Sequence, residues 1–225
     1  MPGRAEAGTP PSTLRKLAYA LTMDLTLGFP LLDALRGCSA VLDVGCGPQG
    51  WSWIRLLGPE RLRQGVGLDS FRPNFEAPPG LPRWSSYVLA EGDKLPFREK
   101  SFDATIGIDF IEHLTKPNAL EAVSEMKRVS RKAVVIVTPN GFLPQSGGVN
   151  PGQEHRSGWT KPELEALGFR VVGLRGLRGL RGEYASPTVS PPAVGLALSL
   201  ASSPLVRMRP SAGFQLLGKW TTPPR

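Results

Sequence analysis

The chain has 225 residues, a formal net charge of +8, 40% hydrophobic residues and 20% charged residues. This balance is that of a globular protein and excludes disordered and fibrous classes. The two cysteines, Cys38 and Cys46, flank one predicted strand, which excludes a disulfide scaffold and favours a reducing compartment.

Membrane and metal signals are weak in this sequence. No segment reaches the roughly 18 consecutive apolar residues of a membrane-spanning helix. Residues 1–16 lack the compact apolar run and the cleavage site of a signal peptide. We therefore expect a cytoplasmic protein whose residues 1–11 are a disordered lead-in. The two histidines and two cysteines show no CxxC or HExxH spacing, so no metal site is expected.

Helical and extended patterns alternate along the chain. Apolar residues at helical spacing, capped by Ser12 and interrupted at Gly28 and Pro30, predict helices within residues 12–37. Short apolar runs then predict strands at 39–45, 64–69, 86–90, 102–109, 133–138, 169–174 and 213–220. Further helices are expected at 51–58, 118–129 and 160–168, the last beginning with a capping box of Thr160 and Glu163.

This alternation predicts an α/β fold with a doubly wound, Rossmann-like, mainly parallel sheet. Several predicted strands are apolar throughout, as expected where helices cover both faces. In such sheets a ligand binds beyond the carboxyl ends of the strands, near the point where the strand order reverses. The loops that follow the strands are therefore the segments in which functional residues are expected.

The first predicted strand runs into a glycine-rich loop. Gly45, Gly47 and Gly50 fit G-x-G-x-x-G, a pattern that allows a tight turn and close approach of a ligand. Asp43 stands before the first glycine, where dinucleotide-binding fingerprints carry an apolar residue, and this argues against a dehydrogenase. The second strand ends in Asp69, an acid suited to binding ribose hydroxyls.

The runs VLDVGCGPQG, GLDS and EGDKLPFREKSFDATIGIDFIEHL together resemble class I S-adenosylmethionine-dependent methyltransferases, in the ubiquinone-biosynthesis-like branch. The resemblance covers residues 39–168. It implies a seven-stranded sheet whose last strand, GFQLLGKW, is antiparallel, and S-adenosylmethionine as the cofactor. We accordingly divide one domain into N-terminal helices (12–37), cofactor-binding core (38–174), basic loop with apolar helix (175–211), and last strand with tail (212–225).

The resemblance also assigns cofactor-binding roles by position. The residues expected along the methionine moiety are Asp43, Gly45, Cys46 and Gly47. Asp69 is expected to bind the ribose hydroxyls, with Ser70 beside it. Loop capping is the alternative role for the two aspartates.

Two further acids are expected near the adenosine and the methyl group. Glu91 is assigned to the adenine amino group, and Asp93, two positions away, is the alternative. A solvated loop acid is the plainer interpretation of Glu91. Asp109 ends the fourth strand and is expected to face the transferable methyl group.

Methyl transfer is an in-line displacement that needs a general base only when the acceptor must lose a proton. His113 and His155 both fall in loops beyond the strand ends, and either can act as that base because histidine titrates near neutral pH. A backbone-bonded turn residue and a loop-packing residue are the alternatives. Trp159 either lines an acceptor pocket or packs at a helix start.

The basic character is concentrated toward the C-terminus, where eight basic residues and one acid lie from Arg170 onward. Three LRG repeats at 174–182 predict a loop or an irregular strand extension, with an arginine comb for a phosphate-bearing acceptor as the alternative. The apolar stretch before Arg207 predicts a core-packed helix. Covering of the acceptor pocket and contact with a membrane surface are its alternatives.

The expected function is methyl transfer to a small-molecule acceptor, on oxygen rather than nitrogen or carbon. An anionic or lipid-like acceptor, of quinone or glycan-linked type, suits the arginines and the apolar helix. The alternatives are an RNA or protein methyltransferase that uses the basic C-terminal region, and a non-catalytic cofactor-binding module. No NPP[YF] follows the fourth strand, which argues against methylation of nucleic-acid amino groups.

Overall fold

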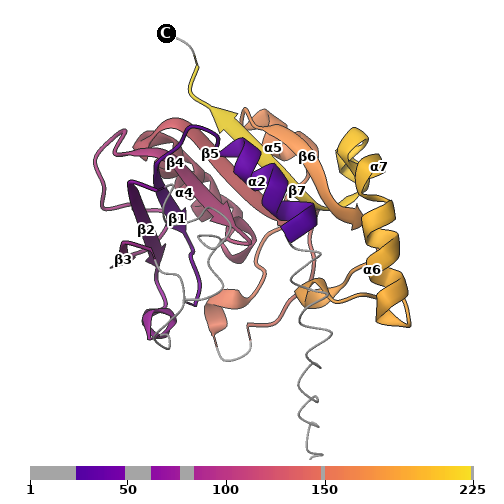
Figure 1. Ribbon diagram of the computed structural model, residues 1–225. Helices are drawn as coiled ribbons and strands as arrows, with labels where there is room; N and C mark the ends of the chain where they lie inside the picture. Colours follow the sequence, from indigo (N-terminus) through magenta and orange to yellow (C-terminus); the bar gives the residue numbers. More distant parts are fainter. Residues whose placement is uncertain (1–23, 49–61, 77–83, 148–149, 224–225) are drawn as a thin grey trace, which may run out of the picture.

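The computed structural model describes residues 24–48, 62–76, 84–147 and 150–223 (Figure 1). The expected lead-in at 1–11, the first part of the N-terminal helices, the helix expected at 51–58 and Gly50 lie outside the described residues. The division of the chain into one domain with the boundaries given above stays a prediction.

Seven strands form one sheet in the order β3-β2-β1-β4-β5-β7-β6. β1 to β5 pair in parallel, and β7 is antiparallel to both of its neighbours, β5 and β6. The strand bounds are Ala40–Val44 (β1), Gln64–Asp69 (β2), Ser86–Leu89 (β3), Phe102–Ile108 (β4), Ser130–Pro139 (β5), Arg170–Leu177 (β6) and Gly213–Thr221 (β7). This confirms the doubly wound sheet with an antiparallel last strand, and the strand order reverses between β1 and β4.

Helices cover both faces of the sheet (Figure 1). The π-turn η1 (Asp24–Gly28) and α2 (Phe29–Ala34) lie on one face, and α4 (Lys116–Val129) lies on the other. The remaining elements are η3 (Arg72–Phe75), η4 (Ile111–His113), η5 (Pro151–Gln153), α5 (Lys161–Ala166), η6 (Glu183–Ala185), α6 (Pro192–Ala201), α7 (Ser203–Met208) and η7 (Pro210–Ala212). Pro30 stands in the first turn of α2, where its missing N–H costs nothing.

The two faces bury two apolar cores. Leu31 of α2 packs in one core, and Met126 of α4 packs in the other. The buried residues of α4 follow the helical spacing: Ala119, Ala122, Val123, Met126 and Val129. Each fully buried large apolar side chain contributes about 1.5–3 kcal/mol, and this burial fixes the sheet that carries the loops. The expected capping box at α5 is confirmed, because the Glu163 carboxylate accepts hydrogen bonds from Thr160 N and Oγ1.

The LRG repeats combine a strand end with a turn. The first repeat belongs to β6, with a bulge at Arg175, whose φ is +61°. A Cβ on Gly176 would lie 2.5 Å from the backbone of Ser199, so glycine there lets α6 approach β6 closely. Arg175 and Arg181 are buried, whereas Arg178 is exposed. The repeats therefore form the irregular strand extension that was expected and not a comb of exposed arginines.

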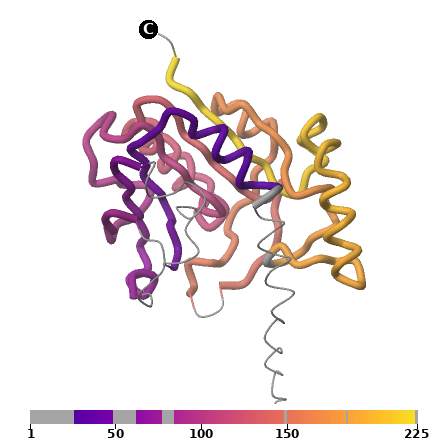
Figure 2. The backbone as a smooth tube through the Cα atoms, viewed as in Figure 1, coloured from indigo at the N-terminus to yellow at the C-terminus, as the bar shows by residue number. Residues whose placement is uncertain are grey.

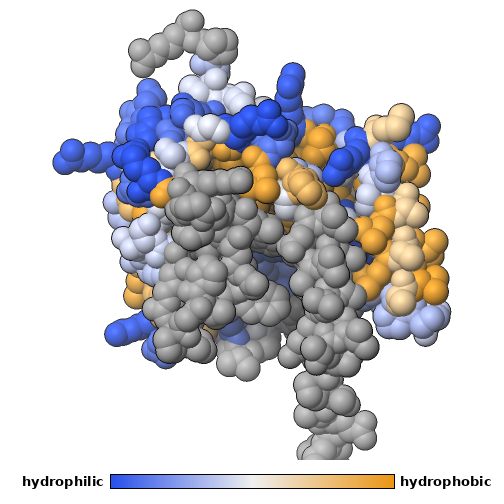
Figure 3. Space-filling model, in the orientation of Figure 1, coloured by the Kyte–Doolittle hydropathy of each residue, from blue (hydrophilic) through white to orange (hydrophobic). Residues whose placement is uncertain are grey.

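The helices α6 and α7 flank the β6 edge of the sheet and carry apolar side chains into solvent (Figures 1 and 3). Only Gly195 and Ser199 of α6 are buried, while Val194, Leu198 and Met208 are exposed. The expectation of a core-packed helix is thus met on one narrow side only. Within the described residues no helix has the length and apolarity needed to cross a membrane, and the cytoplasmic location stays a prediction.

Candidate functional site

The loops that follow the parallel strands gather at one edge of the sheet, which is the lower edge in Figure 2. β1, β2, β4 and β5 all end there, because parallel strands share the direction of their carboxyl ends. The expected site residues of the glycine loop, Asp69, Asp109 and the two histidines all follow these strands. The topology therefore brings to one edge what the sequence spreads over more than a hundred residues.

The glycine loop is tied to β2 by backbone hydrogen bonds. Gly45 and Gly47 have φ values of +71° and +63°, which glycine adopts without strain. The carbonyl oxygen of Leu68 accepts hydrogen bonds from Gly45 N (2.8 Å) and Cys46 N (3.0 Å). Gly47 N donates to Asp69 Oδ2 at 2.9 Å, and Phe71 N donates to Asp69 Oδ1 at 2.8 Å. The loop and the acid at the end of β2 thus form one unit.

The two glycines face different surroundings. A Cβ on Gly45 would lie 2.5 Å from Cδ2 of Phe110, whereas nothing lies within 4 Å of a Cβ on Gly47 among the described residues. The same Phe110 ring also packs against Gly92, where an added Cβ would lie 2.4 Å from Phe110 Cζ. Phe110 therefore supports the loop from the core side, whereas no described residue packs against Gly47.

The other expected cofactor ligands divide between buried and exposed positions. Asp43 is buried, and its Oδ2 accepts a hydrogen bond from Trp84 Nε1 at 3.2 Å. Cys46 is also buried, and burial raises the pKa of its thiol, so this group is neutral. Ser70 and Glu91 are exposed, while Asp93 borders a separate hollow against α4. The role of Asp43 at the methionine moiety stays a prediction, and the hydrogen bond from Trp84 fixes the position of its side chain.

Asp109 directly follows β4 and has a left-handed conformation with φ of +49°. Its Oδ1 accepts a hydrogen bond of 2.6 Å from Gln215 Nε2, and Gln215 Oε1 accepts one of 3.1 Å from Arg175 Nη1. Burial raises the pKa of Asp109, although the charges of Arg175 and His155 oppose that shift. A buried relay from β6 and β7 therefore holds this carboxylate at the end of β4.

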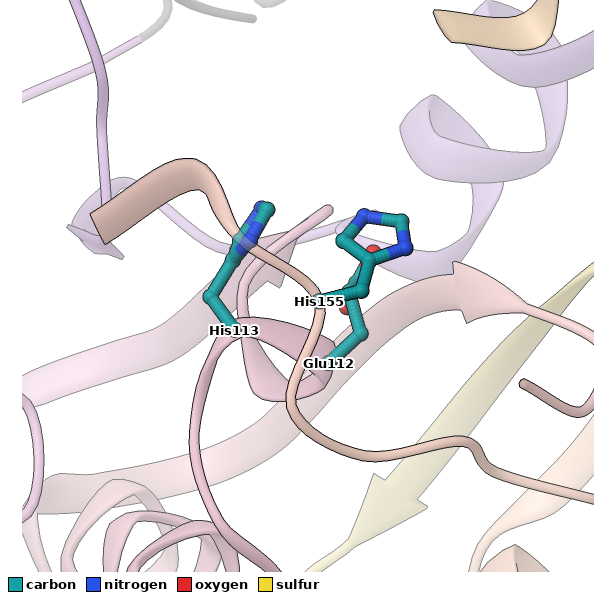
Figure 4. Close-up of side chains that lie close together, drawn as sticks. All are labelled: Glu112, His113 and His155. Carbon is teal, nitrogen blue, oxygen red and sulfur yellow. The ribbon is translucent and has the colours of Figure 1, made fainter. Parts of the chain in front are cut away.

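Glu112, His113 and His155 converge just beyond the end of β4 (Figure 4). The first two belong to η4, and His155 follows η5. One candidate ligand atom of each side chain lies within 4.8 Å of those of the other two. The imidazole centroids are 4.9 Å apart, so the structure brings together the two histidines that the sequence analysis selected.

Backbone carbonyl groups orient both imidazole rings. His113 Nδ1 lies 3.2 Å from the oxygen of Glu154, and His155 Nδ1 lies 2.6 Å from the oxygen of Leu143. Since a carbonyl oxygen can only accept, each Nδ1 carries a hydrogen, and in the neutral form of either ring the lone pair lies on Nε2. Burial lowers the pKa of His113 to about 4, which keeps that ring neutral at pH 7.

Sequence reasoning missed several residues of this edge. Gln215 and Arg175 lie on β7 and β6, and only the sheet order brings them to Asp109. Glu112 precedes a selected histidine, yet no spacing motif singled it out. Trp159, the candidate for lining an acceptor pocket, is instead buried in the core.

Comparison with known proteins gives a consistent family. Residues 42–138 match a family described as "Methyltransferase domain". An uncharacterized methyltransferase of Mycobacterium sp. (strain JLS) is 29% identical over 127 residues, covering 56% of this chain and 48% of that protein. The chain thus spans about half the length of the curated relatives it matches.

Solved structures agree on the fold. A SAM-dependent methyltransferase from Archaeoglobus fulgidus aligns with a TM-score of 0.52 and 22% identity, covering 91% of this chain and 99% of that one. The methyltransferase domain of bacterial CtHen1 aligns with a TM-score of 0.54 and 17% identity, covering 89% and 100%. At such identities the likeness concerns the fold alone.

Proposed function

We propose that the chain is a class I S-adenosylmethionine-dependent methyltransferase, as its similarity to methyltransferases supports, and that it transfers a methyl group to an oxygen atom of a small-molecule acceptor. The observation that carries the proposal is the unit formed by the glycine loop and Asp69 at the reversal point of the sheet. This is the position at which doubly wound sheets bind nucleotide-like ligands.

The residues at this edge fit the cofactor. Each Asp69 oxygen accepts one backbone hydrogen bond, and a carboxylate offers about four acceptor positions. Counted over the described residues, two positions therefore stay available for a ribose diol. No described residue would contact a Cβ at Gly47, which is compatible with a ligand placed against the backbone there. The exposed carboxylate of Glu91 is the proposed partner of the adenine amino group.

When bound, S-adenosylmethionine supplies a methyl group on a sulfonium centre, which a lone pair of the acceptor displaces in line. Asp109, held by Gln215, is the proposed carboxylate beside that methyl group. The Nε2 lone pairs of His113 and His155 are the proposed sites that receive an acceptor proton. Their Nδ1–H bonds to carbonyl groups hold both rings in the required tautomer.

The acceptor is proposed to enter over His155. An open hollow of about 450 Å³ borders this side chain, with Phe142, Glu154 and Glu183 on its rim. The apolar surface of α6 and α7 supports a lipid-like acceptor or contact with a membrane surface. The buried Arg175 and Arg181 are not available at the surface, which weakens the alternative of a nucleic-acid substrate.

A labelling experiment tests the proposal. The full chain would be incubated with S-adenosylmethionine carrying a labelled methyl group and with fractions of a cell extract, separated into metabolites, lipids, RNA and protein. We expect label in a metabolite or lipid fraction, and no label there with Asp69→Ala. Label confined to RNA or protein would contradict a small-molecule acceptor.

A further inference from the structure

We propose that Glu112, His113 and His155 bind a divalent first-row transition-metal ion, such as Zn²⁺, at the acceptor side of the site. The three candidate ligand atoms lie within 4.8 Å of one another. Ligand atoms about 2.1 Å from a tetrahedral metal are about 3.4 Å apart. Shifts on the order of 1 Å per side chain therefore complete the site.

The carboxyl group of Glu112 provides the first argument. It is 1% exposed, and neither of its oxygens makes a hydrogen bond of regular geometry among the described residues, the hydroxyl group of Thr138 being a nearby side-chain donor. A buried carboxyl group without partners is costly, and natural proteins tolerate one where a proton or a cation completes it.

The histidines provide an independent argument. A metal-binding histidine usually donates its second ring N–H to a carbonyl or carboxylate group, which fixes the tautomer. Both imidazole rings here make that bond through Nδ1, to the carbonyl groups of Glu154 and Leu143. A proton acceptor requires one such ring, whereas two rings with a buried carboxyl group beside them form a ligand set.

Main-chain hydrogen bonds fix the two segments that carry these side chains. The carbonyl oxygen of Glu112 accepts hydrogen bonds from Arg156 N (2.8 Å) and Ser157 N (3.0 Å). Ser157 Oγ donates to the oxygen of Ile111 at 3.2 Å. The segment with His155 is thus held against η4 by contacts that do not involve the ligand atoms. A site on such a frame is organised before metal binds.

The donor set indicates the class of metal. Two imidazole nitrogens and one carboxylate suit Zn²⁺, Fe²⁺, Co²⁺ or Mn²⁺, whereas Mg²⁺ and Ca²⁺ prefer oxygen ligands. Three protein ligands leave a position open, as in catalytic metal sites. If the proposed function holds, that position faces the acceptor, and the cation lowers the pKa of a bound hydroxyl group in place of a histidine base.

The test measures metal binding without any assay of activity. The full chain, prepared without a histidine tag and stripped with a chelator, is titrated with Zn²⁺ and Co²⁺. We expect one equivalent to bind, with a Kd raised at least tenfold in each of Glu112→Gln, His113→Ala and His155→Ala. The matched control is Glu121→Gln, which removes an exposed carboxylate of α4 outside the proposed ligand set and should bind like the wild type.

A spectroscopic readout covers the case in which a variant fails to fold. The chain has two histidines, so both Nε2 resonances can be followed in ¹⁵N-labelled wild-type protein, and both should shift with one equivalent of Zn²⁺. No saturable binding by the folded wild type, shifts at fewer than two histidines, or undiminished affinity in the folded variants would overturn the inference. Titration with S-adenosylhomocysteine on the same samples separates this outcome from failure of the proposed function, because that ligand binds at the glycine loop.

Discussion

Two glycines in one loop should lose different amounts of stability on the same substitution to alanine. Gly45 and Gly47 both have φ near +70°, so alanine at either position costs about 1–2 kcal/mol of backbone strain. Only at Gly45 does the new Cβ meet a ring, at 2.5 Å from Phe110. Overpacking of a filled core adds about 1–3 kcal/mol. We expect Gly45→Ala to lower the free energy of unfolding by about 2–5 kcal/mol and Gly47→Ala by about 1–2 kcal/mol.

The two variants should also differ in the affinity of the folded protein for the cofactor. The Cβ of Gly47→Ala would meet no described residue and would lie next to the backbone N–H of residue 47, which donates a hydrogen bond to Asp69. This variant should therefore bind S-adenosylhomocysteine at least tenfold more weakly than the wild type. Gly37→Ala is the matched control, because Gly37 has φ of +75° and open space around it but lies at the opposite end of β1.

The assays are urea unfolding and calorimetric titration with S-adenosylhomocysteine. Gly37→Ala should lose stability like Gly47→Ala and keep the affinity of the wild type. Equal stability of Gly45→Ala and Gly47→Ala would refute the role of Phe110 as a support. An undiminished affinity in Gly47→Ala would refute the position of the cofactor.

Three further results are expected. Asp69→Ala removes the two acceptor positions proposed for the ribose hydroxyls and should weaken S-adenosylhomocysteine binding about 100-fold, at about 1.5 kcal/mol per charged hydrogen bond. Substitution of the exposed Asp33 by alanine is the calorimetric control, and equal affinity of the two variants would contradict the assignment. Asp103 accepts bonds from the N–H groups that begin β1, and although burial opposes its ionisation, these bonds together with Lys132 and Arg131 lower its pKa. The ionised Asp103 therefore contributes fully to the free energy of unfolding above the unfolded pKa of about 3.9, and this contribution is lost as the pH falls toward the folded value. The stability difference between wild type and Asp103→Asn, about 2 kcal/mol at pH 7, should therefore shrink below about pH 4. A difference that stays independent of pH in denaturant unfolding would be inconsistent with this expectation. Gly176→Ala forces α6 away from β6 and should cost about 2–4 kcal/mol in thermal or urea unfolding, which a wild-type midpoint would disprove.

Most of the fold could be predicted from the sequence, because short local patterns mark its strands and helices. Apolar runs that end at Asp69 and near Asp109 marked the strands, and the capping box marked α5. The packing of α6 was harder to foresee, since Gly176 appeared in a repeat that resembled a binding motif. Its role depends on Ser199, which lies more than twenty residues away and meets it only through the tertiary fold.

The candidate site could be predicted from the sequence only where short motifs mark its residues. The glycine loop and Asp69 follow from two motifs, and the histidines follow from their places after strands. The relay from Arg175 through Gln215 to Asp109 depends on the insertion of β7 between β5 and β6, which no short pattern encodes. Glu112 depends in the same way on the packing of η4, because its significance is the absence of a hydrogen bond of regular geometry among the described residues.

The most direct test of the proposed function is calorimetric titration of the full chain with S-adenosylmethionine and S-adenosylhomocysteine. The loop from Gly45 to Gly47 and its bond to Asp69 predict saturable binding of both ligands at one site per chain, with the binding lost in Asp69→Ala. Absence of binding by protein that unfolds cooperatively, or unchanged binding by Asp69→Ala, would contradict a cofactor site at this edge of the sheet.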